Sequence, residues 1–334
     1  MPGRGIRLRR TTCPYYYVTL PLPPPLKGGG EVNESVRLFQ KSLYIIFRKM
    51  NWFYLSLLSA LAHANSDALC KKALRESGVL TVAWVYQGYC AVFLSPLLAF
   101  VGVPELDSTF FFTTLLLIPL EVTALILYQR AIKVSPLSLT LPFLSLTPVF
   151  LLLTSFLMLG ERPDKSGLVG VVLVATGAYL LNVHATKEGL LSPFRVILRE
   201  EGSLMMIIVA LIYSITSNLG KVAIQHSSPL FFATTYPAML AIVLFPITVS
   251  ISGLSPLTSR PALFGLIGLF NALNTLAHCH AIRLVEVPYM ISVKRTSLLI
   301  GVFYGWAFFG ETHLRERLLG SAVMLLGMTF IVVF

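Results

Sequence analysis

The sequence contains few charged residues. Only 12% of its 334 residues are Asp, Glu, Lys or Arg, whereas 55% belong to the hydrophobic set. Ordinary soluble domains are about a quarter charged. A water-soluble fold of this size could not bury so many apolar side chains. The composition therefore excludes an ordinary soluble protein and predicts an all-α integral membrane protein, because helices satisfy their own backbone hydrogen bonds in lipid.

Sequence patterns of enzymes and of metal sites are missing as well. The chain has no Gly-x-Ser-x-Gly elbow, no His-Glu-x-x-His pair and no Gly-rich phosphate loop. Its four cysteines, Cys13, Cys70, Cys90 and Cys279, show neither metal-ligand spacing nor a disulfide framework. We therefore expect no enzymatic activity, no bound metal and no cofactor.

The formal net charge of +11 is concentrated at one end of the chain, because nine of the 26 Lys and Arg residues lie in the first 49 positions. Basic flanks on hydrophobic helices usually report orientation and contact with lipid headgroups. Membrane lipid is therefore an expected partner, and nucleic acid is not.

Residues 1–49 differ from the rest of the chain, with three prolines from Pro23, three glycines from Gly28 and no long apolar run. This composition predicts a disordered basic tail. It also lacks the apolar core and cleavage site of a signal peptide. A second reading stays open, in which Met50 is the true start and the tail is an over-extended reading frame.

Beyond the tail, apolar runs of spanning length alternate with polar, Pro or Gly punctuation. The ten predicted spans are 52–70, 80–103, 109–128, 137–159, 167–183, 204–224, 230–252, 262–281, 288–309 and 318–334.

The sequence repeats itself at an offset of 150 residues without gaps. Matched pairs include Lys71 with Lys221, Tyr86 with Tyr236, Pro96 with Pro246, Gly160-Glu161 with Gly310-Glu311, Gly170 with Gly320, and Gly177 with Gly327. Each repeat holds five spans, an odd number, so the second copy must enter the bilayer from the opposite side.

The sequence thus predicts ten transmembrane helices arranged as two inverted five-helix repeats, 50–183 and 204–334, joined by a loop at 184–203. Inverted repeats of this kind place a substrate site near the midplane of the membrane. The architecture favours transport by alternating access.

Several repeated residues have an expected structural role. Glycines seven apart, Gly170 and Gly177 in one span and Gly320 and Gly327 in its partner, lie near one helix face and allow close helix packing. Gly160-Glu161 and Gly310-Glu311 each end a span. We expect their glutamates to cap or salt-bridge locally in a hairpin at the membrane surface, rather than to bind an ion.

These features resemble the drug/metabolite transporter superfamily, specifically its EamA-type ten-helix members. The resemblance covers residues 52–334. It is carried by the doubled repeat, by Pro148 and the run into Gly160-Glu161-Arg162-Pro163, by the glycines beyond it, and by Val293-Lys294-Arg295-Thr296-Ser297. Members of that family move amino acids, nucleotide sugars, phosphorylated sugars and drugs. The resemblance therefore implies transport much more strongly than it implies a cargo.

Ionisable residues within spans are costly in lipid and are candidates for function. Glu121 lies midway along the third span, and its repeat equivalent is Asn271. Two readings of Glu121 stay open: a carboxylate that binds a proton or a substrate amine, or a structural ion pair with Lys294 or Arg295. Those two cations are about 100° apart on a helix, so we do not expect both to face one point. We favour Arg295 as the inward residue, facing an anionic group.

Other polar residues within spans complete the candidate binding set: His63, Asp67, Tyr86, Tyr236, Asn274 and His278. The two tyrosines fit either the cavity or an interfacial aromatic belt. The histidines lack a neighbouring carboxylate at metal-ligand spacing.

The sequence therefore predicts a secondary active transporter of a small polar or amphiphilic metabolite, with Glu121 as the candidate for proton coupling. A channel, or a membrane sensor or subunit that does not transport, is the alternative. The resemblance implies the plasma membrane, with both termini inside. We expect a small-molecule substrate and a monomer or homodimer.

Overall fold

The computed structural model describes residues 34–135, 137–180, 201–309 and 314–333. The chain divides into two units, Met1–Tyr44 and Ile45–Phe334, and all contacts given below lie within the second. Helix α1 (Glu34–Leu74) begins inside the tail that we expected to be disordered. Apolar residues such as Phe39, Leu43 and Phe47 recur there at helical spacing, which the Pro and Gly runs before them had obscured.

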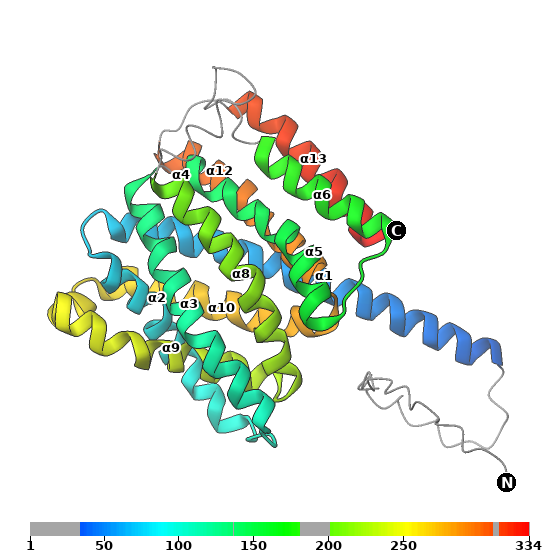
Figure 1. The fold of residues 1–334 in the computed structure, drawn as a ribbon, viewed down its shortest axis with the longest axis horizontal. Helices are drawn as coiled ribbons and strands as arrows, with labels where there is room; N and C mark the ends of the chain where they lie inside the picture. The colour runs from blue at the N-terminus through cyan, green and yellow to red at the C-terminus, as the bar shows by residue number, and fades with distance from the viewer. Residues whose placement is uncertain (1–33, 136, 181–200, 310–313, 334) are drawn as a thin grey trace, which may run out of the picture. The chain divides into compact units, whose positions relative to one another are not determined.

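The described residues contain helices and no strands (Figure 1). The first repeat continues from α1 with α2 (Val79–Leu94), η1 (Ser95–Phe100), α3 (Ser108–Val134), α4 (Leu137–Thr140), η2 (Leu141–Ser145), α5 (Leu146–Leu159) and α6 (Lys165–Leu180). The second repeat holds α8 (Glu201–Gln225), α9 (Pro229–Ser252), η4 (Ser255–Thr258), α10 (Pro261–Leu284), α11 (Val287–Lys294), α12 (Ser297–Phe309) and α13 (Leu314–Val333). Loop residues 181–200 lie outside the described part.

The helices form a ten-span membrane fold. By length and composition, five described helices can each cross a membrane, and shorter apolar helices complete the set. Large apolar side chains lie exposed on the outside of the bundle; Leu115 is 70% exposed and Ile242 is 71% exposed. Lipid would cover such side chains in a membrane protein.

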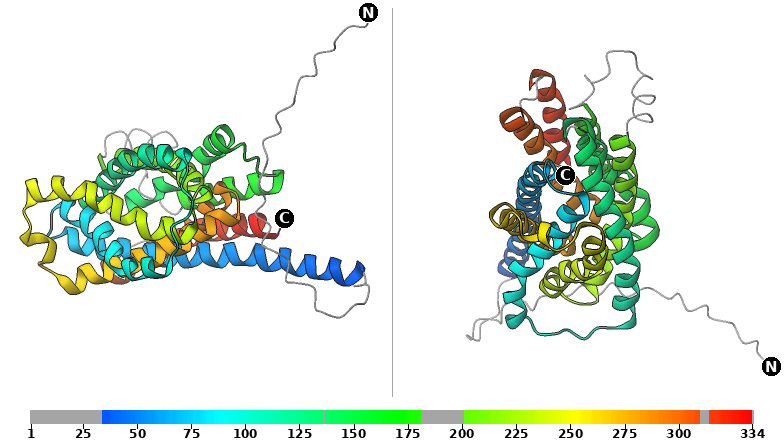
Figure 2. Two further views of the ribbon diagram at one scale, coloured as in Figure 1. Left: turned by 90° about the horizontal axis from the view of Figure 1, so that it is seen from below. Right: turned by 90° about the vertical axis from the view of Figure 1, so that its left-hand side faces the viewer.

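Successive spans run in opposite directions, so their ends fall on two faces. Face A carries the start of α3, the turn between α5 and α6, and the start of α9. Face B carries the turn between α1 and α2 and the starts of α8 and α10. Helices α2, α9 and α10 pack on one another in the two views of Figure 2.

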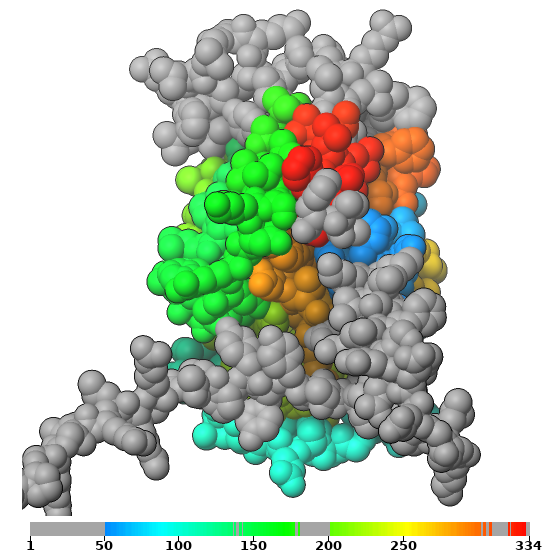
Figure 3. Space-filling model, turned by 90° about the vertical axis from the view of Figure 1, so that its right-hand side faces the viewer, coloured from blue at the N-terminus to red at the C-terminus, as the bar shows by residue number. Residues whose placement is uncertain are grey.

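Helices α6 and α13 pack through the glycines that repeat along the sequence (Figures 1 and 3). A methyl group at Gly170 would lie 2.7 Å from the Gly327 carbonyl oxygen, and one at Gly177 would lie 2.6 Å from the Gly320 carbonyl oxygen. Residue i of one repeat thus contacts residue j of the other, and j contacts i. This reciprocity is the signature of a two-fold axis.

Two lysines, Lys71 and Lys221, make symmetry-related contacts at opposite faces. Lys71 Nζ donates to the Ser135 carbonyl oxygen at 2.8 Å, and Lys221 Nζ donates to its equivalent, the Val285 carbonyl oxygen, at 2.7 Å. These carbonyls follow the last turns of α3 and α10, where cations are favourable. The lysines therefore hold the ends of the third span of each repeat.

Lys221 also forms a buried ion pair with Glu161, at 2.5 Å between Nζ and Oε1. The other carboxylate oxygen of Glu161 accepts from the Val287 backbone N–H at 2.9 Å. Glu161 therefore joins its own turn, after the left-handed Gly160 (φ 67°), to two elements of the other repeat. We had expected this glutamate to bond locally. Glu311 and Gly310 lie outside the described residues.

The fourth and ninth spans are broken rather than continuous. The fourth consists of α4, the 3₁₀ segment η2 and α5, and the ninth is interrupted at Arg295 and Thr296 between α11 and α12. Ser145, at the end of η2, is the repeat equivalent of Arg295. We had expected one helix over 288–309. The hydroxyl groups of Thr296 and Ser297 can compete for backbone hydrogen bonds at such a break.

The close approach of α6 and α13 gives a testable consequence. Gly170→Ala should lower the free energy of unfolding by about 1–3 kcal/mol, because the new methyl group has no room. Gly265→Ala is the matched control, since no atom lies within 4 Å of a methyl group there. It should raise stability by up to about 1 kcal/mol through helix propensity. Equal melting temperatures for the two purified variants would contradict the packing argument.

The buried pair of Lys221 and Glu161 gives a second prediction. Lys221→Met leaves the carboxylate buried without its cation and should cost about 3–5 kcal/mol of stability. Adding Glu161→Met should recover most of the loss, because no uncompensated charge remains. Melting temperatures of both single variants and the double variant measure this coupling. Additive effects would show that the two side chains are independent.

Candidate functional site

The two broken spans meet at the centre of the fold. Arg295, at the break of the ninth span, donates from Nη2 to the Thr147 hydroxyl group at 2.9 Å, and Thr147 lies just beyond the break of the fourth span. A cavity of about 140 Å³ lies beside this contact, lined by residues of both repeats. Glu121, Lys294, Arg295, Asn271 and Tyr236 all line it.

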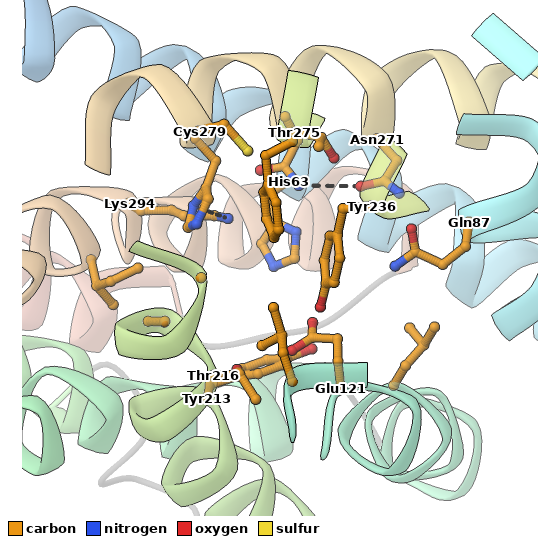
Figure 4. Close-up of a pocket in the computed structure, with 18 of the residues that line it drawn as sticks. His63, Gln87, Glu121, Tyr213, Thr216, Tyr236, Asn271, Thr275, Cys279 and Lys294 are labelled. Carbon is orange, nitrogen blue, oxygen red and sulfur yellow. Dashed lines mark hydrogen bonds between the residues drawn. The ribbon is translucent and has the colours of Figure 1, made fainter. Parts of the chain in front are cut away.

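Glu121 projects into this cavity from the middle of α3 (Figure 4). The Tyr236 hydroxyl group points toward its carboxyl group from α9, and Tyr213 and Thr216 approach it from α8 (Figure 4). Three side chains from two helices thus present hydroxyl groups around one carboxyl group. Such a setting can stabilise a carboxylate or exchange a proton with water that enters the cavity.

Lys294 and Arg295 both line the cavity, although we expected only one of them to face it. Lys294 is the last residue of α11 and Arg295 is its C-cap, and the long side chains of both residues reach the same cavity. Lys294 Nζ lies 3.2 Å from His278 Nδ1 on α10. Arg295 is 4% exposed, and its Nε has no hydrogen-bond partner among the described atoms.

The ion pairs found among the described residues do not include one between Glu121 and either cation. The structural pair that we considered for Glu121 is therefore not formed in this conformation. One carboxyl group and two cations line a single cavity without neutralising one another in direct contact. A ligand with its own charged groups could complete such a site.

A chain of amide groups forms another wall of the cavity. Asn271 Nδ2 donates to the Tyr86 backbone carbonyl oxygen at 2.8 Å, and Asn274 Nδ2 donates to Asn271 Oδ1 at 3.2 Å (Figure 4). Ser59 in turn donates to Asn274 Oδ1 at 2.8 Å. These bonds fix the orientation of both asparagines and tie α10 to α1 and α2.

Asp67 lies behind the cavity wall rather than in it. The carboxyl group accepts from the Tyr128 hydroxyl group at 2.8 Å, and its Oδ2 is 3.7 Å from His63 Nε2. His63 lines the cavity, with its Nδ1 3.4 Å from the Tyr86 hydroxyl oxygen. Among the candidate binding residues, Asp67 is the only one that does not line the cavity. His63, which does line it, is the neighbour of Asp67 on that side.

The cavity extends from the centre toward face A. Ile224, Phe232 and Ile291 line it, and each lies within a few residues of a helix end at that face. On the opposite side α2 and α10 pack tightly, and a methyl group at Gly268 would overlap Tyr89. The Tyr89 hydroxyl group donates to the Leu257 carbonyl oxygen at face B. The structure is therefore closed more firmly toward face B.

Sequence reasoning missed several cavity residues, among them Tyr213, Thr216 and Ser217 on α8. The signal was available in the repeat. The three residues are equivalent to His63, Ser66 and Asp67 at the 150-residue offset, so the polar positions of α1 predict those of α8. Gln87, which also lines the cavity, carried no comparable signal, because its repeat equivalent is Pro237.

Outside the membrane-spanning segments, the surroundings of two carboxyl groups shift their pKa in opposite directions. The Phe110 backbone N–H, which donates to Asp107 at 2.9 Å, lowers the pKa of this N-terminal cap of α3. Burial and the nearby Glu161 carboxylate raise the pKa of Glu286.

In the described part of the chain, no group of three or more His, Cys, Asp or Glu side chains is arranged to hold a metal ion.

Comparisons with known proteins agree with this architecture. A solved crystal structure superposes with a TM-score of 0.63 over 85% of this chain and 97% of its own, at 16% sequence identity. That likeness shows the fold alone. No curated protein sequence matches. The EamA-like transporter family matches residues 50–183 and 201–333, which are the two repeats. This multi-pass membrane protein therefore belongs to the EamA-like transporter family.

Proposed function

We propose that the chain is a secondary active transporter that moves a small polar molecule across the membrane by alternating access. The observation that carries this proposal is the cavity itself. It lies between two inverted repeats, at the meeting point of two broken helices, and it holds charged groups that are not paired with one another. Broken helices at the midplane are a common way to build a transport site.

The lining chemistry supports a substrate with an anionic group. Lys294 and Arg295 present two cations to the cavity, and the buried Nε of Arg295 has no hydrogen-bond partner among the described atoms. Glu121, Tyr236 and Asn274 offer further polar contacts. An engineered cavity of about 150 Å³ in another protein holds benzene, so the room here suits a compact metabolite.

Coupling to protons is part of the proposal, with Glu121 as the carrier. A carboxyl group in lipid is costly when ionised, and one that faces a cavity can exchange its proton with water from one side of the membrane.

With ten spans, both termini lie on one side. We place them in the cytoplasm, following the family resemblance, and place the protein in the plasma membrane.

Counterflow in proteoliposomes tests the transport role. Vesicles loaded with an unlabelled candidate from a panel of small carboxylates, phosphorylated sugars and amino acids should take up the same labelled compound in a saturable way. A channel would give flux without saturation or exchange. Binding without flux would support a sensor, and either result would contradict the proposal.

Arg295→Lys is expected to weaken substrate binding while leaving protein abundance unchanged. Lysine keeps the charge but cannot reproduce the planar fork that holds both Thr147 and an anion. We expect the half-saturating substrate concentration to rise roughly tenfold. Arg130→Lys is the matched control, since Arg130 is an exposed residue paired with Glu201 at face B. Unchanged saturation in Arg295→Lys would remove Arg295 from the binding site.

Glu121→Gln should abolish proton-driven accumulation and leave exchange of substrate intact. Glutamine keeps the shape and much of the hydrogen bonding but does not titrate. The measurement is uptake with and without an inward proton gradient, alongside the abundance of folded protein. If the well-folded variant still accumulated substrate on a proton gradient, Glu121 would not carry the coupling proton.

A further inference from the structure

One contact between the repeats is present in only one of its two symmetry-related copies. Helices α2 and α10 meet through the Asn271 hydrogen bond to the Tyr86 carbonyl oxygen and through Gly268 packed against Tyr89. We call these four residues gate B, because Tyr89 reaches on to the face-B residue Leu257.

The 150-residue offset gives the symmetry-related set, which we call gate A: Glu121 for Asn271, Tyr236 for Tyr86, Ile118 for Gly268 and Met239 for Tyr89. The cavity occupies this place, with Glu121 on α3 and Tyr236 on α9 among its lining residues. No hydrogen bond in the described part of the chain joins Glu121 to the Tyr236 carbonyl oxygen. Gate B is therefore formed and gate A is not.

Inverted repeats exchange conformations when such a carrier switches sides. In the opposite state α3 and α9 would meet at the place where α10 and α2 meet now, but farther apart, because Ile118 stands where α10 has Gly268. The side chain of Glu121 is one carbon longer than that of Asn271 and would then reach the Tyr236 carbonyl oxygen. The amide of Asn271 is a donor at any pH. An ionised carboxylate only accepts, as does a carbonyl group. The same geometry is therefore attractive for a protonated Glu121 and repulsive for an ionised one.

We propose that gate A closes only when Glu121 carries a proton that it donates to the Tyr236 carbonyl oxygen, whereas gate B closes through Asn271 without one. The proposal rests on the proposed function of alternating access, and it states how protonation controls that switch. Glu121 is thereby a gating residue as well as a cavity residue. The two repeats share a shape, but the hydrogen bond of gate A requires a proton on Glu121 and that of gate B does not.

Several groups around Glu121 bear on its protonation. Tyr213 faces it from α8, Tyr236 from α9 and Lys294 from α11. His63 of α1 and His278 of α10 line the same cavity, as does Arg295 at the break of the ninth span. Closure removes water from the carboxyl group, which favours the protonated form.

The direction of the pH effect follows from linkage. Because the closed form of gate A binds the proton more tightly, lowering the pH shifts the population toward closure. Exchanging one hydrogen bond for two facing acceptors should change the ratio of closed to open by roughly tenfold. Glu121→Gln supplies a permanent donor and biases gate A toward closure. It does not lock the gate, just as Asn271 need not lock gate B.

Distances between nitroxide labels test the proposal without any substrate. Leu115 on α3 and Ile242 on α9 report gate A, and both are exposed on the outside of the bundle. Their repeat equivalents are Gly265 and Val92, which report gate B; Val92 is 67% exposed and Gly265 has room for a side chain. Cysteines are placed at one pair at a time, with Cys13→Ser. The native Cys70, Cys90 and Cys279 are buried.

Purified full-length protein in lipid nanodiscs is measured by pulsed electron spin resonance across a range of pH. The distance between labels at 115 and 242 should shorten as the pH falls. In Glu121→Gln the short distance should be enriched, and to the same degree at every pH. Asn271→Asp is the corresponding substitution in gate B, because it replaces a permanent donor by a carboxyl group that can ionise. In this variant the distance between labels at 92 and 265 should lengthen as the pH rises. All three results together support the proposal.

The proposal is overturned if the distance between 115 and 242 shows the same pH dependence in the parent and in Glu121→Gln, or if it depends on pH in neither and is equal in both. It is also overturned if Asn271→Asp leaves gate B insensitive to pH in a variant that elutes and melts as the parent does. Counterflow is measured separately on the same preparations. Absent flux with the expected distances contradicts the transport function alone.

Discussion

The fold depends on one constraint: a backbone group within lipid must find its partner inside the protein. An unbroken helix meets this requirement alone, and most of the spans are unbroken. The fourth and ninth spans are not, so their free groups can be tolerated only where other protein surrounds them. Both breaks occur at equivalent positions, Ser145 and Arg295, and they face each other at the centre. The cavity and its cations follow from that meeting.

Much of this could be predicted from the sequence. The 150-residue offset gave the two repeats, and their odd number of spans gave the inversion. The glycines of α6 and α13 pack as their spacing indicated, because a missing side chain has the same effect wherever the helix lies. Glu121 and Lys294 stood out as charges within apolar runs, and both line the cavity. A charged residue within an apolar run can be recognised from the sequence alone, and its cost in lipid marks it as a candidate for function.

The remainder required three dimensions. No proline marks the break at Arg295, so the apolar run from 288 to 309 has the appearance of one helix. The ion pair of Lys221 with Glu161 joins residues 60 positions apart in different repeats. Nothing in the sequence near either residue indicates that the other is its partner. Asp67 and His63 are one turn apart on α1, yet only His63 reaches the cavity. Which side of a helix faces the centre depends on the neighbours that cover it.

The contact between α6 and α13 has a mechanical consequence. It is reciprocal, with Gly170 against Gly327 and Gly177 against Gly320. A contact of this kind maps onto itself under the same two-fold operation that would interchange the two conformations of the repeats. It has no need to break or to find new partners during that interchange. In the proposed alternation, the contact between α6 and α13 can therefore stay formed, and only contacts that lie away from the two-fold axis need to change.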